Sequence, residues 1–203
     1  MPVAKRPDKF EVPSWEYIHE ICVQLADQLR QSKYQPDLLV AIARGGLVPG
    51  RLLSDLLEKT DIATIKVEHY VDFYKTTKKP EITHPLPIDI RGRKILIVDD
   101  IADSGHSLRL VRAYLLRQGA KDVKICAMYF KPWSIVIPDF YARETDAWVC
   151  FPHETLESIR KIYMKLRKKG KSKKEIEKYL IKIGINPFFI QKFLPQVSSK
   201  KIN

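Results

Sequence analysis

The prediction of the fold rests on ILIVDDIADSGHS, residues 95–107 of a 203-residue chain. The stretch opens with four apolar residues, three of them β-branched, which is typical of a strand buried on both faces of a parallel sheet. Two carboxylates, Asp99 and Asp100, come next. A short polar loop from Asp103 to Ser107 then leads into an apolar-periodic helix. This arrangement predicts a phosphate-binding turn, because free amide groups and the positive end of the helix point at the anion.

A plainer interpretation of the same loop is that Asp103 and Ser104 only cap the helix. Three features favour a ligand site instead: the adjacent acids at the end of the strand, a third acid four positions after Asp99, and the Ser-Gly-x-Ser turn. Carboxylates at the carboxyl end of a strand lie where open α/β sheets bind their ligands.

A second strand–turn–helix precedes the first. Asp37–Ala43 is apolar and is predicted to form a buried strand, and a tight turn of Arg44, Gly45 and Gly46 follows it before another helix. A plain turn between strand and helix also favours glycine, so this turn alone leaves both interpretations open. A cation beside paired glycines is nevertheless suited to an anion.

The remaining chain predicts an α/β domain followed by helices. Strands are expected at residues 62–67, 123–130 and 147–151, and a helix from Ser14 to about Ser32. Residues 68–87 contain prolines and lysines without a clean period, which indicates a long lid loop or a solvated surface loop. From His153 onward the pattern is helical, with a capping box at Ser172 and Glu175.

Composition indicates a globular chain with a net charge of +12. Nearly all of the excess follows residue 150, which favours anionic partners near that end. The sequence has neither an apolar run long enough to span a membrane nor a cleavable signal pattern. Its three cysteines lie among apolar residues and are expected to be buried free thiols of a cytoplasmic protein.

Residues 95–107 resemble the signature of the type I phosphoribosyltransferases, which bind 5-phosphoribosyl-1-pyrophosphate (PRPP). The resemblance implies a mostly parallel sheet flanked by helices. It also implies that Asp99 and Asp100 bind the PRPP ribose and Mg²⁺, and that Asp103 is catalytic. The 5′-phosphate would be held by the loop, that is by Asp103, Ser104, Gly105, His106 and Ser107.

The same resemblance implies roles for other segments. Arg44, Gly45 and Gly46 would bind pyrophosphate, and the family often has a cis peptide at the position of Ala43–Arg44. Residues 68–87 would close over the active site, with these candidates for reaching pyrophosphate: Tyr70, Tyr74, Lys75 and Lys78.

Residues 129–154 resemble the 6-oxopurine branch of the family. Lys131, Trp148 and Val149 would bind the purine, and Glu154 would hold a water molecule on the metal. Two plainer interpretations stay open: Trp148 as a core aromatic and Lys131 as a solvated lysine. One departure is His153, where many of these enzymes have tryptophan.

We therefore expect a phosphoribosyltransferase core at residues 1–152 and a basic three-helix bundle at 153–203. Lysine can donate to a 6-oxo group but cannot accept from an amine, which favours hypoxanthine, guanine or xanthine. His153 and a likeness of the bundle to the tail of crenarchaeal adenine phosphoribosyltransferases favour adenine. The prediction is adenine plus PRPP giving AMP and pyrophosphate, by a homodimer.

A different class of function stays open beside the enzyme. Some members of this fold are PRPP-sensing regulators that bind nucleic acid, and the basic bundle suits such a role. An acid at Asp103 and a complete base pocket favour catalysis, since a regulator needs neither. Nucleic acid is therefore not the expected partner.

Overall fold

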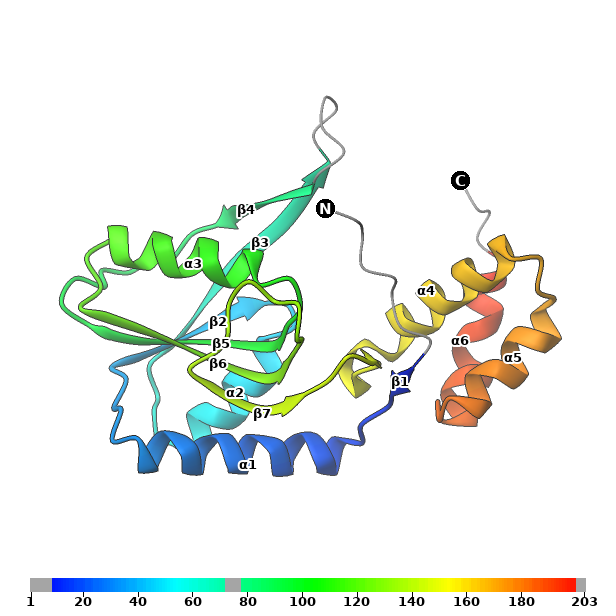
Figure 1. Cartoon of the computed structure of the whole chain (residues 1–203), viewed down its shortest axis with the longest axis horizontal. Coiled ribbons are helices and arrows are strands. Elements are labelled where there is room, and N and C mark those ends of the chain that lie inside the picture. Colours follow the sequence, from blue (N-terminus) through cyan, green and yellow to red (C-terminus); the bar gives the residue numbers. More distant parts are fainter. Residues whose placement is uncertain (1–8, 72–77, 200–203) are drawn as a thin grey trace. The chain divides into compact units, whose positions relative to one another are not determined.

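Figure 1 shows the computed structural model, which describes residues 9–71 and 78–199, with the backbone alone for 69–71, 78 and 79. The chain divides into two compact units. One is Ile18–Thr145, and the other combines the described parts of 1–17 and 146–203. The elements in chain order are β1 (Phe10–Glu11), α1 (Trp15–Gln31), β2 (Leu38–Ala43), α2 (Leu47–Leu56), β3 (Ile62–Val71), β4 (Lys78–His84), β5 (Lys94–Ala102), α3 (His106–Arg117), β6 (Asp122–Phe130), β7 (Phe140–Glu144), β8 (Trp148–Val149), η1 (Pro152–Glu154), α4 (Thr155–Lys168), α5 (Lys173–Lys182) and α6 (Pro187–Ser199).

The larger unit is built on a six-stranded sheet in the order β4-β3-β2-β5-β6-β7. All neighbouring strands are parallel except β3 and β4. The central register places Val40 of β2 beside Ile97 of β5, and Ile97 beside Ile125 of β6. These side chains are fully buried, as expected for strands covered on both faces.

Helices cover both faces of this sheet, with α3 on one side and α1 and α2 on the other (Figure 1). The α3 side buries Leu108, Val111 and Leu115 against alternate residues of the central strands. On the opposite face Cys22 of α1 lies 3.9 Å from Met128 of β6, measured between the sulfur atoms. The structure thus confirms the predicted α/β class.

Two segments differ from the sequence-based expectation. Most of residues 68–87 is not irregular, because β3 runs on to Val71 and pairs with β4 in an antiparallel hairpin. Pro80 is compatible with β4 because an edge strand has one side free of ladder bonds. The sixth strand of the large sheet is β7, which was not predicted, whereas β8 pairs with β1 in a separate two-stranded sheet.

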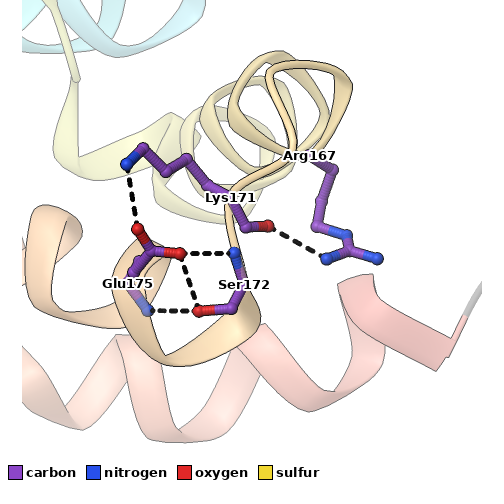
Figure 2. Close-up of polar contacts among 4 residues, drawn as sticks. All are labelled: Arg167, Lys171, Ser172 and Glu175. Carbon is purple, nitrogen blue, oxygen red and sulfur yellow. Dashed lines mark hydrogen bonds and ion pairs between the residues drawn. The ribbon is translucent and has the colours of Figure 1, made fainter.

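The smaller unit contains the predicted helices α4, α5 and α6. Their apolar faces bury Ile159, Ile176, Leu180 and Ile190 in one cluster, against which Trp148 of β8 packs. The predicted capping box opens α5: the Ser172 hydroxyl accepts from the Glu175 amide, and the Glu175 carboxylate accepts from the Ser172 amide (Figure 2). No helix within residues 9–71 and 78–199 is long and apolar enough to cross a membrane.

Candidate functional site

The two adjacent carboxylates lie inside the last part of β5 rather than after it, which corrects the predicted strand end. β5 continues to Ala102 because β6 is equally long and pairs with it up to Phe130. Asp100 is 6% exposed, and its amide donates to Asp99 Oδ1 at 3.0 Å. Both side chains therefore lie at the carboxyl end of a central strand, and Asp103 is the first residue beyond it.

Residues 103–107, here called the phosphate loop, lead from β5 into α3. Gly105 is the N-cap of α3 with a left-handed φ of 76°, a conformation that favours glycine. The N-cap residue has no side chain that could cap the helix, and the His106 amide lies 3.5 Å from Ser104 Oγ. Ser104 thus makes one cap-like contact, and the interpretation of this loop as a helix cap stays open beside that of a ligand site.

The turn at the end of β2 also leads into a helix that begins at a glycine. Gly46 is the N-cap of α2 and, like Gly105, brings no side-chain cap. The helices α1, α5 and α6 are capped instead by the side chains of Ser14, Ser172 and Asn186. The first amides of a helix generally lack partners within the helix, which suits such an end to an anion. At α2, however, the amides of Gly46 and Leu47 already donate to the carbonyls of Ile42 and Arg44.

The turn of Arg44, Gly45 and Gly46 lies directly against β5. The peptide between Ala43 and Arg44 is cis, as the resemblance implied. A Cβ built on Gly45 would lie 2.5 Å from the carboxyl carbon of Asp100. A Cβ on Gly46 would overlap the carbonyl oxygen of Val98. The predicted pyrophosphate turn and the predicted ribose carboxylates are therefore in contact.

Strand order explains why these two turns meet. From β2 the chain crosses through α2 to β3 on one side, whereas β5 pairs with the other side of β2. The strand order thus reverses between β2 and β5, and open α/β sheets bind ligands outside the strand ends at such a point. The turn at Arg44 and the phosphate loop flank this position.

The segment after β6 completes the arrangement within the larger unit. The Lys131 amide donates to the carbonyl of Ala102 at 3.0 Å. The residue is 4% exposed, so the interpretation of Lys131 as a solvated lysine is wrong. Trp133, which was not among the predicted site residues, donates from its indole Nε1 to Asp103 Oδ1 at 2.9 Å. The sequence signal that could have identified Trp133 is its place two positions after Lys131, because a tryptophan has an indole N–H that seeks a hydrogen-bond partner.

Three predicted residues lie in the smaller unit. The Trp148 ring is half-buried, stacks on Phe10 with centroids 6.5 Å apart, and has Lys161 Nζ 5.8 Å from its centre. The Trp148 amide donates to the carbonyl of Lys9, just before β1, and the Cys150 amide donates to the carbonyl of Glu11 in β1. Alternation along the strand therefore turns the backbone groups of Val149 away from β1.

Two further positions in this unit follow from the sequence analysis. Glu154 is half-buried in η1, and its amide donates to the carbonyl of Phe151 at 3.0 Å. The ring of His153 stacks on Phe151 with centroids 5.0 Å apart. His153 therefore contributes an aromatic packing surface at this position.

The lid candidates are only partly covered. Tyr70 lies in β3 and Lys78 in β4, with their side chains outside the description, and Tyr74 and Lys75 lie outside the described residues. Their roles stay predictions.

The cysteines offer no nucleophile. Cys22, Cys126 and Cys150 are free and buried, as expected. Burial raises the pKa of Cys22 to about 12 and that of Cys150 to about 11, and it raises the pKa of Cys126 as well. Since only a thiolate is strongly nucleophilic, the three thiols are inert at neutral pH.

Comparisons with known proteins agree with this geometry. The family model described as "Phosphoribosyl transferase domain" matches residues 14–157. A xanthine-guanine phosphoribosyltransferase of Gluconobacter oxydans is 34% identical over 144 residues, which cover 70% of this chain and 83% of that protein. The crystal structure of a purine phosphoribosyltransferase from Pyrococcus horikoshii Ot3 is 35% identical, with a TM-score of 0.65 over 71% of this chain and 93% of that one. A xanthine-guanine-hypoxanthine phosphoribosyltransferase of Helicobacter pylori is 25% identical, with a TM-score of 0.63 over 73% of this chain and 99% of that one.

These comparisons correct the prediction of adenine as the base. The similar curated proteins are named for xanthine and guanine, so the predicted formation of AMP from adenine is wrong. The likeness of the bundle to crenarchaeal adenine phosphoribosyltransferases is also unsupported, because the family match ends at residue 157.

The family match begins at the cap of α1 and ends in the first turn of α4. It therefore contains every strand of the large sheet and both glycine-capped turns at its ligand-binding edge. The chain belongs to the type I phosphoribosyltransferases.

Proposed function

We propose that this protein transfers the 5-phosphoribosyl group of PRPP to a 6-oxopurine, releasing pyrophosphate. Guanine, xanthine and hypoxanthine are the substrates. The names of the similar proteins support this class of base.

The observation that carries the choice of base is the burial of Lys131 at the end of β6. The whole Lys131 residue is 4% exposed, and its backbone amide donates to the carbonyl of Ala102, the residue before the phosphate loop. A lysine ammonium has three donors and no acceptor. A 6-oxo oxygen offers it an acceptor, whereas the amino group of adenine would bring a second donor against a buried charge, which is unfavourable.

The phosphates of PRPP are assigned to the two glycine-capped turns. The amides and hydroxyls at Ser104–Ser107 hold the 5′-phosphate, and Arg44 with Gly45 and Gly46 holds pyrophosphate. Asp99 and Asp100 accept from the ribose hydroxyls. In the smaller unit, Trp148 supplies a stacking face and Val149 its backbone groups. Stacking on an aromatic side chain is worth roughly 1–3 kcal/mol per base.

The chemistry is a displacement at C1′ of the ribose. The bond from purine N9 to C1′ forms while the bond from C1′ to the pyrophosphate oxygen breaks, and pyrophosphate leaves with the electron pair. The proton on purine N7 moves to the carboxylate of Asp103. A positioned acid or base of this kind typically contributes about 10²–10⁴-fold to the rate.

Magnesium is the proposed cofactor. The described residues form no cluster of three histidine, cysteine or acidic side chains that could hold a metal. Mg²⁺ commonly binds through one or two carboxylates, substrate phosphates and waters, so Asp99 and Asp100 fit it. When bound, it neutralises charge on the leaving pyrophosphate. Glu154 is assigned a metal-bound water on the family resemblance alone.

The test is a product assay with PRPP, Mg²⁺ and each of guanine, xanthine, hypoxanthine and adenine. We expect equal amounts of nucleotide and pyrophosphate from the 6-oxopurines and little product from adenine. Lys131→Met should lower kcat/KM for the 6-oxopurines roughly ten- to hundredfold, as expected for a lost bond from a charged donor. Lys124→Met, in the strand β6 that leads to Lys131, is the control. Turnover of none of the bases, or a preference for adenine, would overturn the proposal.

A further inference from the structure

Lys131–Val136, here called the KPW segment, is hydrogen-bonded to the end of β5 and to the phosphate loop. The Lys131 amide donates to Ala102, and the Ile135 amide donates to the carbonyl of Ser104 at 3.1 Å. A Cβ on Gly105 would lie 2.6 Å from Ser134 Oγ and 2.8 Å from the amide nitrogen of Val136. The two segments therefore pack with no space between them.

The position of Trp133 follows from the local sequence. The Ser134 amide donates to the carbonyl of Lys131 at 2.9 Å, which closes a four-residue turn. Pro132 is the second residue of this turn, where its fixed φ is favoured, and Trp133 is the third. The turn thus fixes the backbone position from which the Trp133 side chain extends.

From there the indole reaches Asp103. Trp133 Nε1 donates to Asp103 Oδ1 at 2.9 Å, and within the described chain this is the carboxylate's one hydrogen bond, so Oδ2 has none. An indole offers a single donor and no acceptor, and its bond to an ionised carboxylate is strong for a hydrogen bond. An exposed aspartate in a loop would otherwise rotate freely. The bond to Oδ1 fixes the direction of Oδ2.

The ring of the same indole meets the proposed base-binding cation. Lys131 Nζ lies 5.5 Å from the centre of the Trp133 ring, within the range of a cation–π contact. Trp133 therefore contacts both residues assigned to one edge of the purine. Lys131 is assigned to O6 and Asp103 to N7, and these two atoms are neighbours on that edge.

We infer that Trp133 is a positioning residue, which holds the Asp103 carboxylate with Oδ2 directed at purine N7. The inference rests on the proposed function, since it concerns the proton transfer in that reaction. Trp133 itself touches no reacting atom. Its effect should appear in the chemical step and not in PRPP binding.

The decisive variant is Trp133→Phe, which keeps an aromatic ring beside Lys131 and removes the N–H. We expect kcat with guanine to fall roughly ten- to hundredfold, the order of loss that follows a misplaced catalytic group. The KM for PRPP and the calorimetric affinity for PRPP should stay within twofold of the wild type. Trp15→Phe makes the same change at a tryptophan of similar exposure, 51% against 41%, and should leave kcat unchanged.

A double-mutant comparison separates positioning from general loop stability. In an Asp103→Asn background, Trp133→Phe should cost less than twofold, because the two residues act through one carboxylate. An unchanged kcat in the single variant, or the same loss in both backgrounds, would overturn the inference. If the wild type converted no purine, the proposed function itself would be wrong. Failure of the inference about Trp133 and failure of the proposed function are therefore distinguishable.

Discussion

Gly45 and Gly46 lie against β5 so closely that neither has room for a side chain. The atoms that a Cβ would meet differ between the two positions. At Gly45 a Cβ would meet the carboxyl group of Asp100, whereas at Gly46 it would meet the backbone of Val98 and Ile42. A carboxyl group can move, but a central strand cannot. Alanine at the two positions should therefore have different effects.

We expect Gly45→Ala to fold and to bind PRPP weakly. Moving Asp100 displaces the group assigned to the ribose hydroxyls, so the KM for PRPP should rise roughly tenfold or more while purine affinity changes less. Calorimetric titration with PRPP and with guanine separates the two ligands. Equal losses for both would indicate a general disturbance of the fold.

Gly46→Ala is expected to lower stability instead. Overpacking of a well-packed region typically costs about 1–3 kcal/mol, so the midpoint of chemical denaturation should fall with little change in its slope. An unchanged midpoint for Gly46→Ala would show that β2 and β5 tolerate the added methyl group.

The sequence predicted the site residues that lie together in one motif, and it missed a contact that depends on a distant turn of the chain. Asp99, Asp100 and the phosphate loop follow one another in a single stretch, so their proximity needs no tertiary information. The pairing of Trp133 with Asp103 depends on the chain returning along β6 and turning at Pro132, which no local pattern reports. The prediction of adenine as the base was wrong. The donor chemistry of Lys131 favoured a 6-oxopurine, but the likeness of the C-terminal bundle to that of adenine phosphoribosyltransferases was given more weight.

Among the helices and strands, α5 shows most directly how the local sequence determines where a helix begins. Ser172 and Glu175 satisfy each other's backbone amides, and Glu175 also pairs with Lys171 at 2.9 Å (Figure 2). Ser172→Ala should destabilise α5 by about 1 kcal/mol, which corresponds to roughly fivefold faster amide exchange in that helix. Hydrogen exchange read by mass spectrometry would report it. Ser198→Ala, whose hydroxyl only donates to Pro195 at 3.0 Å, is the control.

The same cap makes α5 sensitive to acid. Hydrogen bonds from Lys171, and from the amide and hydroxyl of Ser172, lower the pKa of Glu175 from 4.5 to about 2. A carboxyl group whose pKa is lower in the folded state stabilises it fully above the unfolded pKa and loses this effect as pH falls. Exchange protection of α5 should therefore decline between about pH 4.5 and pH 2. Glu175→Gln should remove that part of the decline, and Glu177→Gln should not.

At this scale the long, periodic elements were predictable and the edge strands were not. The helices α1 and α4–α6 have apolar stripes, and α1, α5 and α6 also have capping side chains. β2 is a continuous apolar run, and β5 and β6 each contain one. β4 and β7 lie at the two edges of the large sheet, where side chains face solvent and no apolar run is required. Their pairing is a property of the neighbouring strand, so their own sequences indicate it poorly.

Over the whole molecule, the compact units and the family match do not share a boundary. The match ends at residue 157, whereas the smaller unit starts at Asp146 and continues through the bundle. Trp148 and Cys150 contribute to the same apolar cluster as Ile159, Ile176 and Ile190. The bundle therefore supports the strand that carries two proposed purine-binding residues, Trp148 and Val149.

If this support matters, disturbing the bundle core should weaken purine binding more than PRPP binding. Ile190→Ala removes a side chain that is 1% exposed in α6, and such truncations typically cost about 2–5 kcal/mol. We expect the KM for guanine to rise roughly tenfold, the equivalent of one lost stacking contact, with a smaller change in the KM for PRPP. Phe188→Ala, 66% exposed on the same helix, is the matched control and should leave both constants unchanged.

Truncation after Glu157 is the stronger form of the same experiment. It keeps Glu154 and β8 but removes α5, α6 and most of α4, so Trp148 keeps its contact with Phe10 but loses its packing against the helices. The expected result is a folded larger unit with poor purine affinity and retained PRPP binding. The contrary result is informative too. If the truncated protein and Ile190→Ala both keep the purine KM of the wild type, the bundle is no part of base binding. Its cationic helices would then be better explained by nucleic acid, whose binding should weaken steeply as salt is raised.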